Sequence, residues 1–339
     1  MKLLIAATAM VATPAAAQTT PLFASDVPIR ITIRGPINAI ARTAEDSAGP
    51  RDGALSLTGT SETYPIRLTA RGLTRRLKQT CSFPPLRVEF AQKPAATSLF
   101  AGQGRLKLVT HCQNQESFQQ HLLLEYSAYR IFNLISPMSF RARLATVDYA
   151  EPNGKVSTTR WGFFIEDIDD VARRNGMIKP MVGERIPTTQ LDPKQGARVA
   201  LFEYMIGNLD WSMRAGPAGE PCCHNSRLIA ARGSAAFTSV PYDFDYSGLV
   251  DAPYAVPPDG IPVSSVKTRF YQGYCRFNSE VVAAAAEFRA KRPAIEAMFA
   301  QLPLTPRPRA KALAYLASFY DQIATDESLN AKVLKKCMS

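Results

Sequence analysis

The spacing of apolar side chains changes once along this chain, near Asp167. Before Asp167, short runs alternate apolar with polar side chains, and turns containing Gly, Pro or Asn separate these runs. A period of two is typical of strands that bury one face. After Asp167, apolar side chains recur at every third or fourth position, which is typical of helices. We therefore expect an α+β protein, with the strands first and the helices second.

Seven alternating runs predict strands, over residues 31–33, 55–57, 66–68, 86–90, 106–109, 140–149 and 160–166. A helix is expected among them, over residues 116–134, because Phe118, Leu122 and Tyr126 have helical spacing. Later helices are predicted over residues 194–207, 278–302 and 309–321, and from Glu327 onward. These elements divide the chain into a β-rich part, residues 18–166, and an α-rich part, residues 167–339.

The first 17 residues have the pattern of a secretory signal peptide. Lys2 supplies the positive charge, a short apolar stretch follows, and Ala15 to Ala17 match the small residues of a cleavage site. This stretch is too short for a bilayer, which takes about 20 apolar residues, and no later segment is long and apolar enough. We expect a secreted or periplasmic protein without a transmembrane segment.

Six cysteines in an exported chain predict disulfide bonds. The expected pairs are Cys81 with Cys112, which flank strand-like runs, and Cys275 with either Cys222 or Cys223. A zinc site at Cys222, Cys223 and His224 is disfavoured, because a structural zinc site needs four ligands in two spaced pairs.

The net charge of +11 is concentrated in the first half of the chain. Residues 18–160 hold 18 basic and 10 acidic side chains, whereas residues 161–339 hold 21 and 19. Such an excess suits an anionic partner, or solubility alone. The basic run from Arg71 to Lys78 lacks the interleaved aromatic side chains of nucleic-acid binders, so we expect no nucleic-acid partner.

Polar residues suited to phosphate chemistry follow one another in the second half. Gly207, Asn208 and Asp210 end a predicted helix, His224 and Asn225 come next, and a third group runs from Pro241 to Gly248. In phosphoryl transfer, one carboxylate orients the attacking hydroxyl, while an Asn and a second carboxylate hold magnesium on the phosphates. Because Mg²⁺ prefers oxygen ligands, Asn225 with either Asp243 or Asp245 is a candidate metal site.

The order G-N-x-D, then H-N, then P-Y-D-x-D resembles the catalytic core of atypical kinases of the CotH-type and HipA-like families. The resemblance covers roughly residues 100–250. It implies a two-lobed protein-kinase-like fold, with a β-rich N-terminal lobe and an α-rich C-terminal lobe. It also implies that Asp210 is catalytic and that Asn225 and Asp243 bind the metal, with Asp245 as the near alternative.

The same resemblance implies nucleotide-binding residues upstream. Lys107 corresponds to the strand lysine that contacts the nucleotide phosphates, and Glu125 lies on the helix expected to pair with it. Arg105 and Arg130 remain alternatives for these roles. Glu166 falls in residues 163–169, which resemble the hinge strand where adenine docks.

One spacing departs from this pattern. Kinases place the metal-binding Asn about five residues after the catalytic Asp, whereas Asp210 and Asn225 are 15 positions apart. A disulfide from Cys222 or Cys223 to Cys275 is expected to fold the insert, residues 213–223, back and restore the geometry.

The resulting hypothesis is a secreted CotH-like kinase that uses ATP and Mg²⁺ or Mn²⁺. It would transfer a phosphoryl group to a hydroxyl of a protein or a glycan. The rival hypothesis is a non-catalytic, pseudokinase-like envelope protein that binds an anionic partner through its basic first lobe. The acceptor and the oligomeric state stay open.

Other interpretations of these residues also stay open. Asn208 and Asp210 are common turn formers, and Asp243 and Asp245 could cap a turn or bind calcium. A paired-carboxylate glycosidase is also compatible with the acids. A serine hydrolase or a zinc protease is not, because the chain has neither G-x-S-x-G nor H-E-x-x-H.

Overall fold

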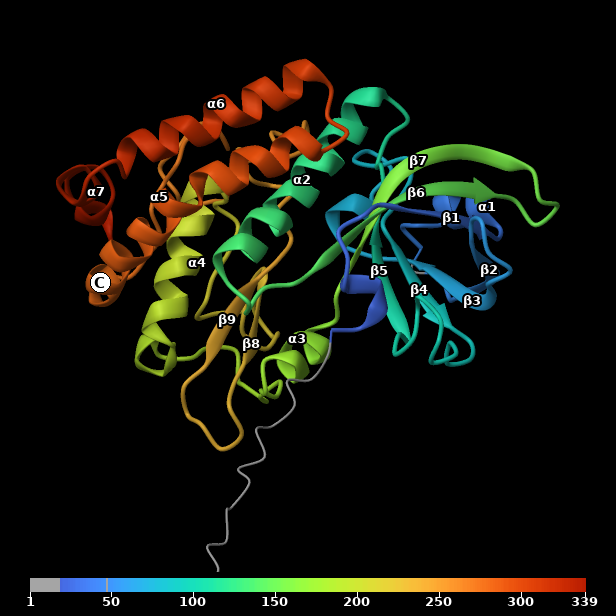
Figure 1. Cartoon of the computed structure of the whole chain (residues 1–339), viewed down its shortest axis with the longest axis horizontal. Helices are drawn as coiled ribbons and strands as arrows, with labels where there is room; N and C mark the ends of the chain where they lie inside the picture. Colours follow the sequence, from blue (N-terminus) through green and yellow to red (C-terminus); the bar gives the residue numbers. More distant parts are fainter. Residues whose placement is uncertain (1–18, 47) are drawn as a thin grey trace, which may run out of the picture.

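A computed structural model describes residues 19–46 and 48–339; the predicted signal peptide, residues 1–17, lies outside them. Seven strands form one closed barrel in the order β1-β2-β3-β4-β5-β7-β6 (Figure 1). Their bounds are β1 Ile29–Arg34, β2 Arg51–Leu57, β3 Thr63–Ala70, β4 Leu86–Phe90, β5 Arg105–Val109, β6 Ala142–Ala150 and β7 Val156–Ile165. Each of the seven strands predicted from alternation is confirmed, to within a few residues at the ends.

The barrel closes where β1 pairs in parallel with β6, with Ile29 opposite Ala145 and Arg34 opposite Ala150. The other neighbouring strands pair antiparallel. The expected two-lobed protein-kinase-like fold is therefore wrong, because the sheet closes on itself as a barrel. Alternation shows that a strand buries one face, but it does not show which distant strand becomes its partner.

The inside of the barrel is a hydrophobic core of its own. Side chains that point inward from successive strands meet there, and they are buried: Ile31, Ile33, Leu55, Ile66, Leu68, Leu86, Val88, Leu106, Leu108, Val147, Tyr149 and Phe164. Burial at every second position is what the period of two predicts for a small closed barrel.

The helices form a second core beside the barrel. In Figure 1, α2 (Glu116–Ile135) runs between the barrel and α5 (Asn278–Gln301), and it also packs against β6, β7 and α4 (Pro193–Ile206). The other helices are α1 Ile37–Arg42, α3 Ile168–Arg174, α6 Pro306–Gln322 and α7 Asp326–Lys332, and a separate hairpin pairs β8 Ser226–Ile229 with β9 Thr238–Pro241. The predicted helices over residues 116–134, 194–207, 278–302 and 309–321 are confirmed.

All six cysteines are paired. The predicted Cys81–Cys112 disulfide is confirmed. The predicted bond from Cys275 to the vicinal pair is wrong, because Cys275 bonds to Cys337 and Cys222 bonds to Cys223. The chain end causes this difference, since the backbone of Met338 pairs with that of Gly273 and Cys275 and so brings Cys337 beside Cys275.

No helix within residues 19–46 and 48–339 combines the length and the apolar character needed to cross a membrane.

Gly207 ends α4 in a left-handed conformation, with φ of 65°. A Cβ atom at this position would lie 2.0 Å from the Tyr315 hydroxyl oxygen, so a side chain is excluded both by the backbone and by packing. The carbonyl of Gly207 also accepts the backbone N–H of Gly248. This turn therefore joins α4 to the polypeptide after β9.

We predict that Gly207→Ala lowers the free energy of unfolding for two reasons, which can be measured separately. The left-handed backbone costs about 1–2 kcal/mol, and the collision with Tyr315 adds about 1–3 kcal/mol. Gly154→Ala is the control, because Gly154 has φ of 84° and a Cβ atom there would have no neighbour within 4 Å, so it should show the cost of the backbone alone. Urea melts measure both. Adding Tyr315→Phe removes the hydroxyl that the new Cβ atom meets, so the double variant should recover part of the cost of the collision. If the changes in unfolding free energy of the two single variants simply add up in the double variant, the packing explanation is contradicted.

Candidate functional site

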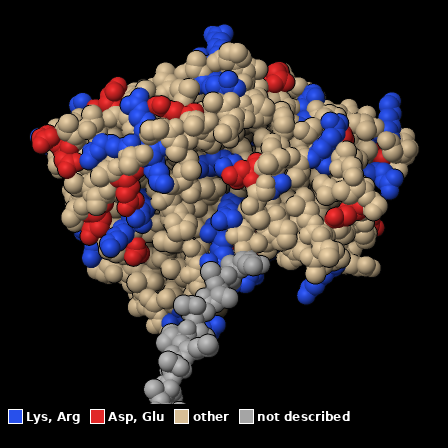
Figure 2. Space-filling model, in the orientation of Figure 1, with Lys and Arg blue, Asp and Glu red and all other residues tan. Residues whose placement is uncertain are grey.

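A cavity of about 460 Å³ opens where loops of the barrel meet loops of the helical part. Its lining comes from the β3–β4 connection, the segment after α4, the residues before and in β8 and the residues after β9, and it includes Arg71, Gly72, Leu73, Thr74, Arg75, Asp210, His224, Asn225, Arg227, Tyr242, Asp243, Asp245 and Tyr246. In Figure 2, basic and acidic side chains adjoin one another in the hollow near the centre of the face shown. The cavity is thus lined by both signs of charge.

The turn after α4 positions Asp210. The side chain of Asn208 is buried, and its Oδ1 accepts the backbone N–H of Asp210 at 3.1 Å. The indole N–H of Trp211 donates to the carbonyl of Asn208 at 3.2 Å. An Asn side chain that bonds two residues ahead is a common way to fix a tight turn. The same hydrogen bond from Asp210 to Asn208 therefore forms the turn and holds Asp210 in position.

Asp210 contacts both residues of the His224-Asn225 pair. Nε2 of His224 donates to Oδ1 of Asp210 at 2.7 Å. Nδ2 of Asn225 donates to Oδ2 of Asp210 at 3.0 Å and to its backbone carbonyl at 2.7 Å. The hydrogen bond to Asp210 raises the pKa of the His224 imidazole above its usual value. Because Asn225 donates with its nitrogen, its oxygen stays available as an acceptor or a metal ligand.

Backbone hydrogen bonds close the insert between Asp210 and Asn225. Ser212 donates its N–H to the carbonyl of His224 at 2.9 Å, and His224 donates to Ala215 at 2.8 Å. No disulfide to Cys275 is needed, since these bonds return the chain to Asp210. The 15-residue spacing is therefore compatible with direct contact between Asp210 and Asn225.

Asp243 joins this group from the end of β9. The N–H of Tyr242 donates to the carbonyl of Asn225 at 3.1 Å, which keeps the two segments together. Asp243 has φ of 67°, a left-handed conformation that Asp tolerates, and its N–H donates to the Tyr129 hydroxyl at 3.0 Å. Its side chain is 39% exposed, so Asp243 presents a carboxylate to the cavity.

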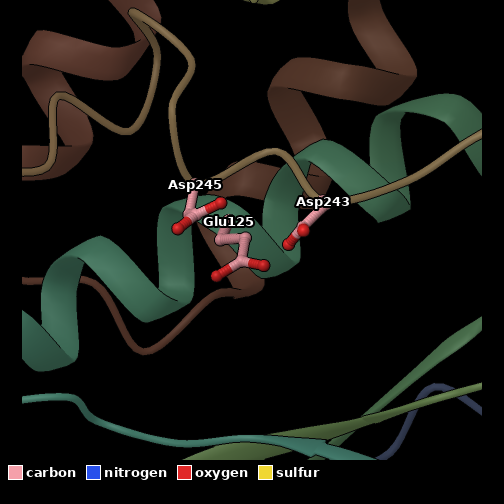
Figure 3. Close-up of side chains that lie close together, drawn as sticks. All are labelled: Glu125, Asp243 and Asp245. Atoms are coloured by element: carbon pink, nitrogen blue, oxygen red, sulfur yellow. The ribbon is translucent and has the colours of Figure 1, made fainter. Parts of the chain in front are cut away.

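Arg75 lies among three carboxylates. Its guanidinium contacts Glu125 at 3.0 Å, Asp245 at 3.2 Å and Asp243 at 3.3 Å. Figure 3 shows the three acids drawn together, with Glu125 on α2 and the aspartates on the segment after β9. Burial raises the pKa of the Glu125 and Asp245 carboxyls, and the positive charge of Arg75 offsets part of this rise. Arg75 is buried too, so it forms an ion cluster with the buried Glu125 and Asp245 and with the partly exposed Asp243.

This cluster changes the interpretation of the three acids as a metal site. One carboxylate oxygen from each of Glu125, Asp243 and Asp245 lies within 4.8 Å of the others, a spacing that suits a metal ion. Arg75 already supplies the positive charge there, however, and Asp245 also accepts the Tyr254 hydroxyl at 3.1 Å. Of the two aspartates, Asp243 is the one with a side chain open to the cavity.

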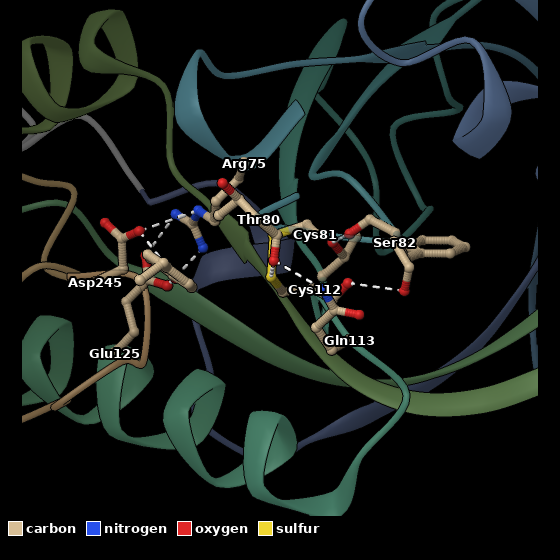
Figure 4. The surroundings of a disulfide bond; sticks show 11 residues. Arg75, Thr80, Cys81, Ser82, Cys112, Gln113, Glu125 and Asp245 are labelled. Carbon is tan, nitrogen blue, oxygen red and sulfur yellow. Dashed lines mark hydrogen bonds and ion pairs between the residues drawn. A yellow bond between two sulfur atoms is a disulfide. The ribbon is translucent and has the colours of Figure 1, made fainter. Parts of the chain in front are cut away.

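The segment that carries Arg75 is fixed by the Cys81–Cys112 disulfide. Figure 4 shows Arg75 bonded to Glu125 and Asp245, with the disulfide a few residues further along the chain. Gln113 Nε2 also donates to the carbonyl of Thr80 at 2.8 Å. A covalent loop closure of this length stabilises a fold by about 3–4 kcal/mol in the chain-entropy model, and here it restrains the residues next to the ion cluster.

Lys107 occupies a position beside the cavity. Its Nζ lies 5.4 Å from the ring centre of Tyr242 and 5.9 Å from that of Phe140. Burial, followed by the neighbouring Arg71, lowers the pKa of Lys107 to about 8. Among the described residues, the ion-pair partner of Glu125 is Arg75, not Lys107.

Glu166 is fully buried at the end of β7. Arg174 donates to both of its carboxylate oxygens, at 3.0 and 3.1 Å, and the N–H of Arg141 donates at 2.9 Å. The structure thus brings together Asp210, Asn225, Asp243 and Asp245, with Glu125 beneath them, and leaves Glu166 in a separate ion pair. Of the alternatives upstream, Arg105 is exposed and Arg130 pairs with Asp26 at 2.6 Å.

The sequence did not assign the arginines of the cavity to the predicted site. Arg71 and Arg75 belong to the basic run from Arg71 to Lys78, for which an anionic partner and solubility alone both stayed open, and Arg227 belongs to no motif. The useful signal was the position of that run, between two strands and just before Cys81.

Comparison with models of known protein families gives no match for this chain, and comparison with curated proteins gives none either.

We predict that Arg75→Met lowers the free energy of unfolding by about 3–5 kcal/mol at pH 8, because it leaves buried carboxylates without their cation. The deficit should shrink toward pH 5, since protonation of Glu125 and Asp245 removes the unpaired charges. Urea melts at both pH values measure it. Arg198→Met is the control: its pair with Glu287 lies at the surface, so the loss should stay below about 1 kcal/mol. A pH-independent loss, or one no larger than the control, would contradict the cluster's role.

We also predict an opposite pH effect at Glu203, which lies on α4 just before the Asp210 turn. Glu203 is fully buried, and burial raises its pKa well above the usual value, although Asn208 offsets part of this rise. The folded state therefore holds a proton that the unfolded state releases above about pH 4.3, so stability falls as pH rises from there. Glu203→Gln should remove this loss and gain more stability at pH 8 than at pH 5.

Glu287→Gln is the matched control for that experiment. The hydrogen bond from Arg198 lowers the pKa of Glu287, so its stabilising contribution is present above the unfolded pKa and is lost at lower pH. Its replacement should cost more at pH 8 than at pH 4, the reverse of the Glu203 result. Equal pH profiles for the two variants would show that the Glu203 carboxyl is not held protonated.

Proposed function

We propose that this protein is a divalent-metal-dependent phosphotransferase that moves a phosphoryl group from a nucleotide, such as ATP, to a hydroxyl of a protein or a glycan. The observation that carries the proposal is that Asp210, Asn225 and Asp243, which lie far apart in sequence, line one cavity together with arginines. Phosphoryl transfer depends mainly on positioning and on neutralising phosphate charge, and these are the groups that do both.

In this proposal, Asn225 and Asp243 hold Mg²⁺ or Mn²⁺. The nitrogen of Asn225 is bound to Asp210, so its oxygen faces away from that carboxylate. Asp243 contacts Arg75 through Oδ1, and its second oxygen has no donor among the described residues. Magnesium takes few protein ligands and completes its shell with water and phosphate oxygens, so two side chains suffice.

Asp210 orients the attacking hydroxyl, and His224 controls how available its carboxylate is. While His224 is protonated, the imidazolium donates a charged hydrogen bond to Oδ1 of Asp210, so that oxygen is less available to the substrate hydroxyl. Because the pKa of His224 is raised, activity should increase as the pH rises through that value. Arg71, Arg75 and Arg227 add positive charge around the reacting phosphate.

Location outside the cytoplasm is part of the proposal. Three disulfides within the described residues favour an oxidising compartment, because such bonds are rare in reducing ones. The N-terminal pattern of a signal peptide supports secretion or a periplasmic site.

A non-catalytic role as an anion-binding envelope protein is the second candidate. The observation that favours it is Arg75, which fills the space among Glu125, Asp243 and Asp245 with a guanidinium. In that case the cavity would bind a phosphate group but would not activate it.

Phosphoryl transfer to generic acceptors tests the two candidates against each other. We expect oxidised protein to label casein or its own hydroxyls from γ-labelled ATP with Mg²⁺ or Mn²⁺, and Asp210→Asn and Asp243→Asn to reduce the rate by about 10²–10³-fold. Asp259→Asn is the matched control, since Asp259 lines the same cavity further along the segment after β9 but has no role in the proposal, and its rate should stay within a few-fold of the wild type.

A thermal shift assay accompanies the transfer assay. Mg²⁺ with ATP should raise the melting temperature of the wild type but not of Asp243→Ala. A shift without transfer would favour the anion-binding protein, and the absence of any shift at millimolar nucleotide would contradict both candidates.

The predicted signal peptide has its own test. N-terminal sequencing of exported material should give a sequence that begins close to Gln18.

A further inference from the structure

Three basic side chains surround the Tyr242 ring at the cavity. The guanidinium of Arg227 lies 5.0 Å from the ring centre, and the ammonium of Lys107 lies 5.4 Å from it. Arg71 interacts electrostatically with Tyr242 and with Lys107, and it lines the cavity with Arg227 and Tyr242. We call Arg71, Lys107 and Arg227 the cationic triad.

No member of the cationic triad forms an ion pair with a carboxylate of the described residues, although Asp243 lies close enough to interact electrostatically with Arg71 and Lys107. Some arginines at this depth have carboxylate partners, as Arg75 has Glu125 and Arg174 has Glu166, whereas others, such as Arg143, donate to backbone carbonyls. Within residues 19–46 and 48–339, no carboxylate lies in ion-pair distance of any member of the triad. All three side chains are half-buried, so water screens them less than it screens surface lysines.

Like charges gathered without a counter-ion destabilise one another, and an anion relieves that cost. After burial, Arg71 and Arg227 each lower the pKa of Lys107, whereas Asp167 and Asp243 offset part of that effect. Arginine is the side chain that matches phosphate, because its planar N–H groups donate two parallel hydrogen bonds. Aromatic support from Tyr242 holds the Arg227 guanidinium in a fixed direction.

The position of the triad indicates which anion it serves. Tyr242 directly precedes Asp243, and its N–H is bonded to Asn225. An anion on the triad would thus lie next to the residues proposed to hold the metal. A chain of phosphates carries more negative charge than a single phosphate, so it can engage all three cations at once. The cavity of about 460 Å³ is within the usual size range for a small-molecule site.

We infer that Arg71 and Arg227, with Lys107 beside them, form a subsite for the condensed phosphate chain of the ligand, and that this subsite binds without a metal ion. The inference deepens the proposed function, because it rests on the same cavity and names what holds the donor. The shared chemistry is a linear di- or triphosphate, either free or attached to a nucleoside.

Calorimetry with inorganic tripolyphosphate in EDTA tests the subsite directly. We expect wild-type protein to bind tripolyphosphate, and Arg71→Gln and Arg227→Gln each to weaken binding by about 10–100-fold, the loss expected for a charged hydrogen bond. Arg232→Gln is the matched control, because Arg232 is exposed on the β8–β9 loop, and its affinity should equal that of the wild type. Raising the salt from 50 to 200 mM should weaken binding in the wild type.

The arms of the experiment separate the source of the phosphate chain and check the fold. Tighter binding of ATP than of tripolyphosphate would support a nucleotide ligand, and equal or weaker binding of ATP would support free polyphosphate. Both results support the subsite, provided that the two Gln variants lose affinity for whichever ligand binds. Arg71→Lys and Arg227→Lys keep the positive charge but lose the planar N–H groups of arginine. If the Gln variants lose affinity because they lose a charge, and not because they misfold, the Lys variants should regain part of the affinity.

Two results would overturn the inference. Equal tripolyphosphate affinity in the wild type and both Gln variants would show that the chain binds elsewhere, and no binding at millimolar concentration would show that there is no such subsite. These results are distinguishable from failure of the proposed function. Tripolyphosphate binding without phosphoryl transfer keeps the subsite and removes the catalysis, whereas transfer that is unaffected in the Gln variants keeps the catalysis and removes the subsite.

Discussion

The ion cluster centred on Arg75 is the interaction on which the site depends. Its guanidinium comes from the β3–β4 connection of the barrel, whereas its partners come from α2 and from the segment after β9. Two of the three acids are buried, so removing Arg75 would leave charges in the interior at a cost of several kcal/mol. The barrel and the helical part thus meet at the cavity through a charge pattern that specifies one arrangement, and Asp243 is held at its edge.

This cluster divides the acids of the cavity by role. Glu125 and Asp245 are buried and occupied by Arg75, so they act on the site through its geometry. Asp210 and Asp243 are partly exposed and have oxygens directed to the cavity. The separation explains why many carboxylates can lie close together without mutual repulsion dominating. It also leaves the cationic triad without a carboxylate at ion-pair distance among the described residues.

The sequence predicted local structure better than long-range pairing. Alternation and helical spacing located the strands and the main helices, because each pattern reports which side chains face a core. Closure of the barrel through β1 and β6 joins segments that are distant along the chain, and no local pattern specifies such a partner. The same limit applies to Cys275, whose partner Cys337 is brought in by backbone pairing at the chain end. The order of Asp210, Asn225 and Asp243 could be read as one site, but the arginines could not, since a basic run looks the same on a surface and in an interior.

The Cys81–Cys112 bond makes the cavity depend on the redox state of these two cysteines. It anchors the β3–β4 connection, which carries Arg71 and Arg75. Both side chains line the cavity, and Arg75 contacts the acids of the helical part. A chain whose Cys81 and Cys112 are still thiols must hold that connection by weaker forces alone. Protein in which Cys81 and Cys112 are thiols is therefore expected to have a looser cavity than protein in which they are bonded, so full assembly of the site requires the oxidation of these two cysteines.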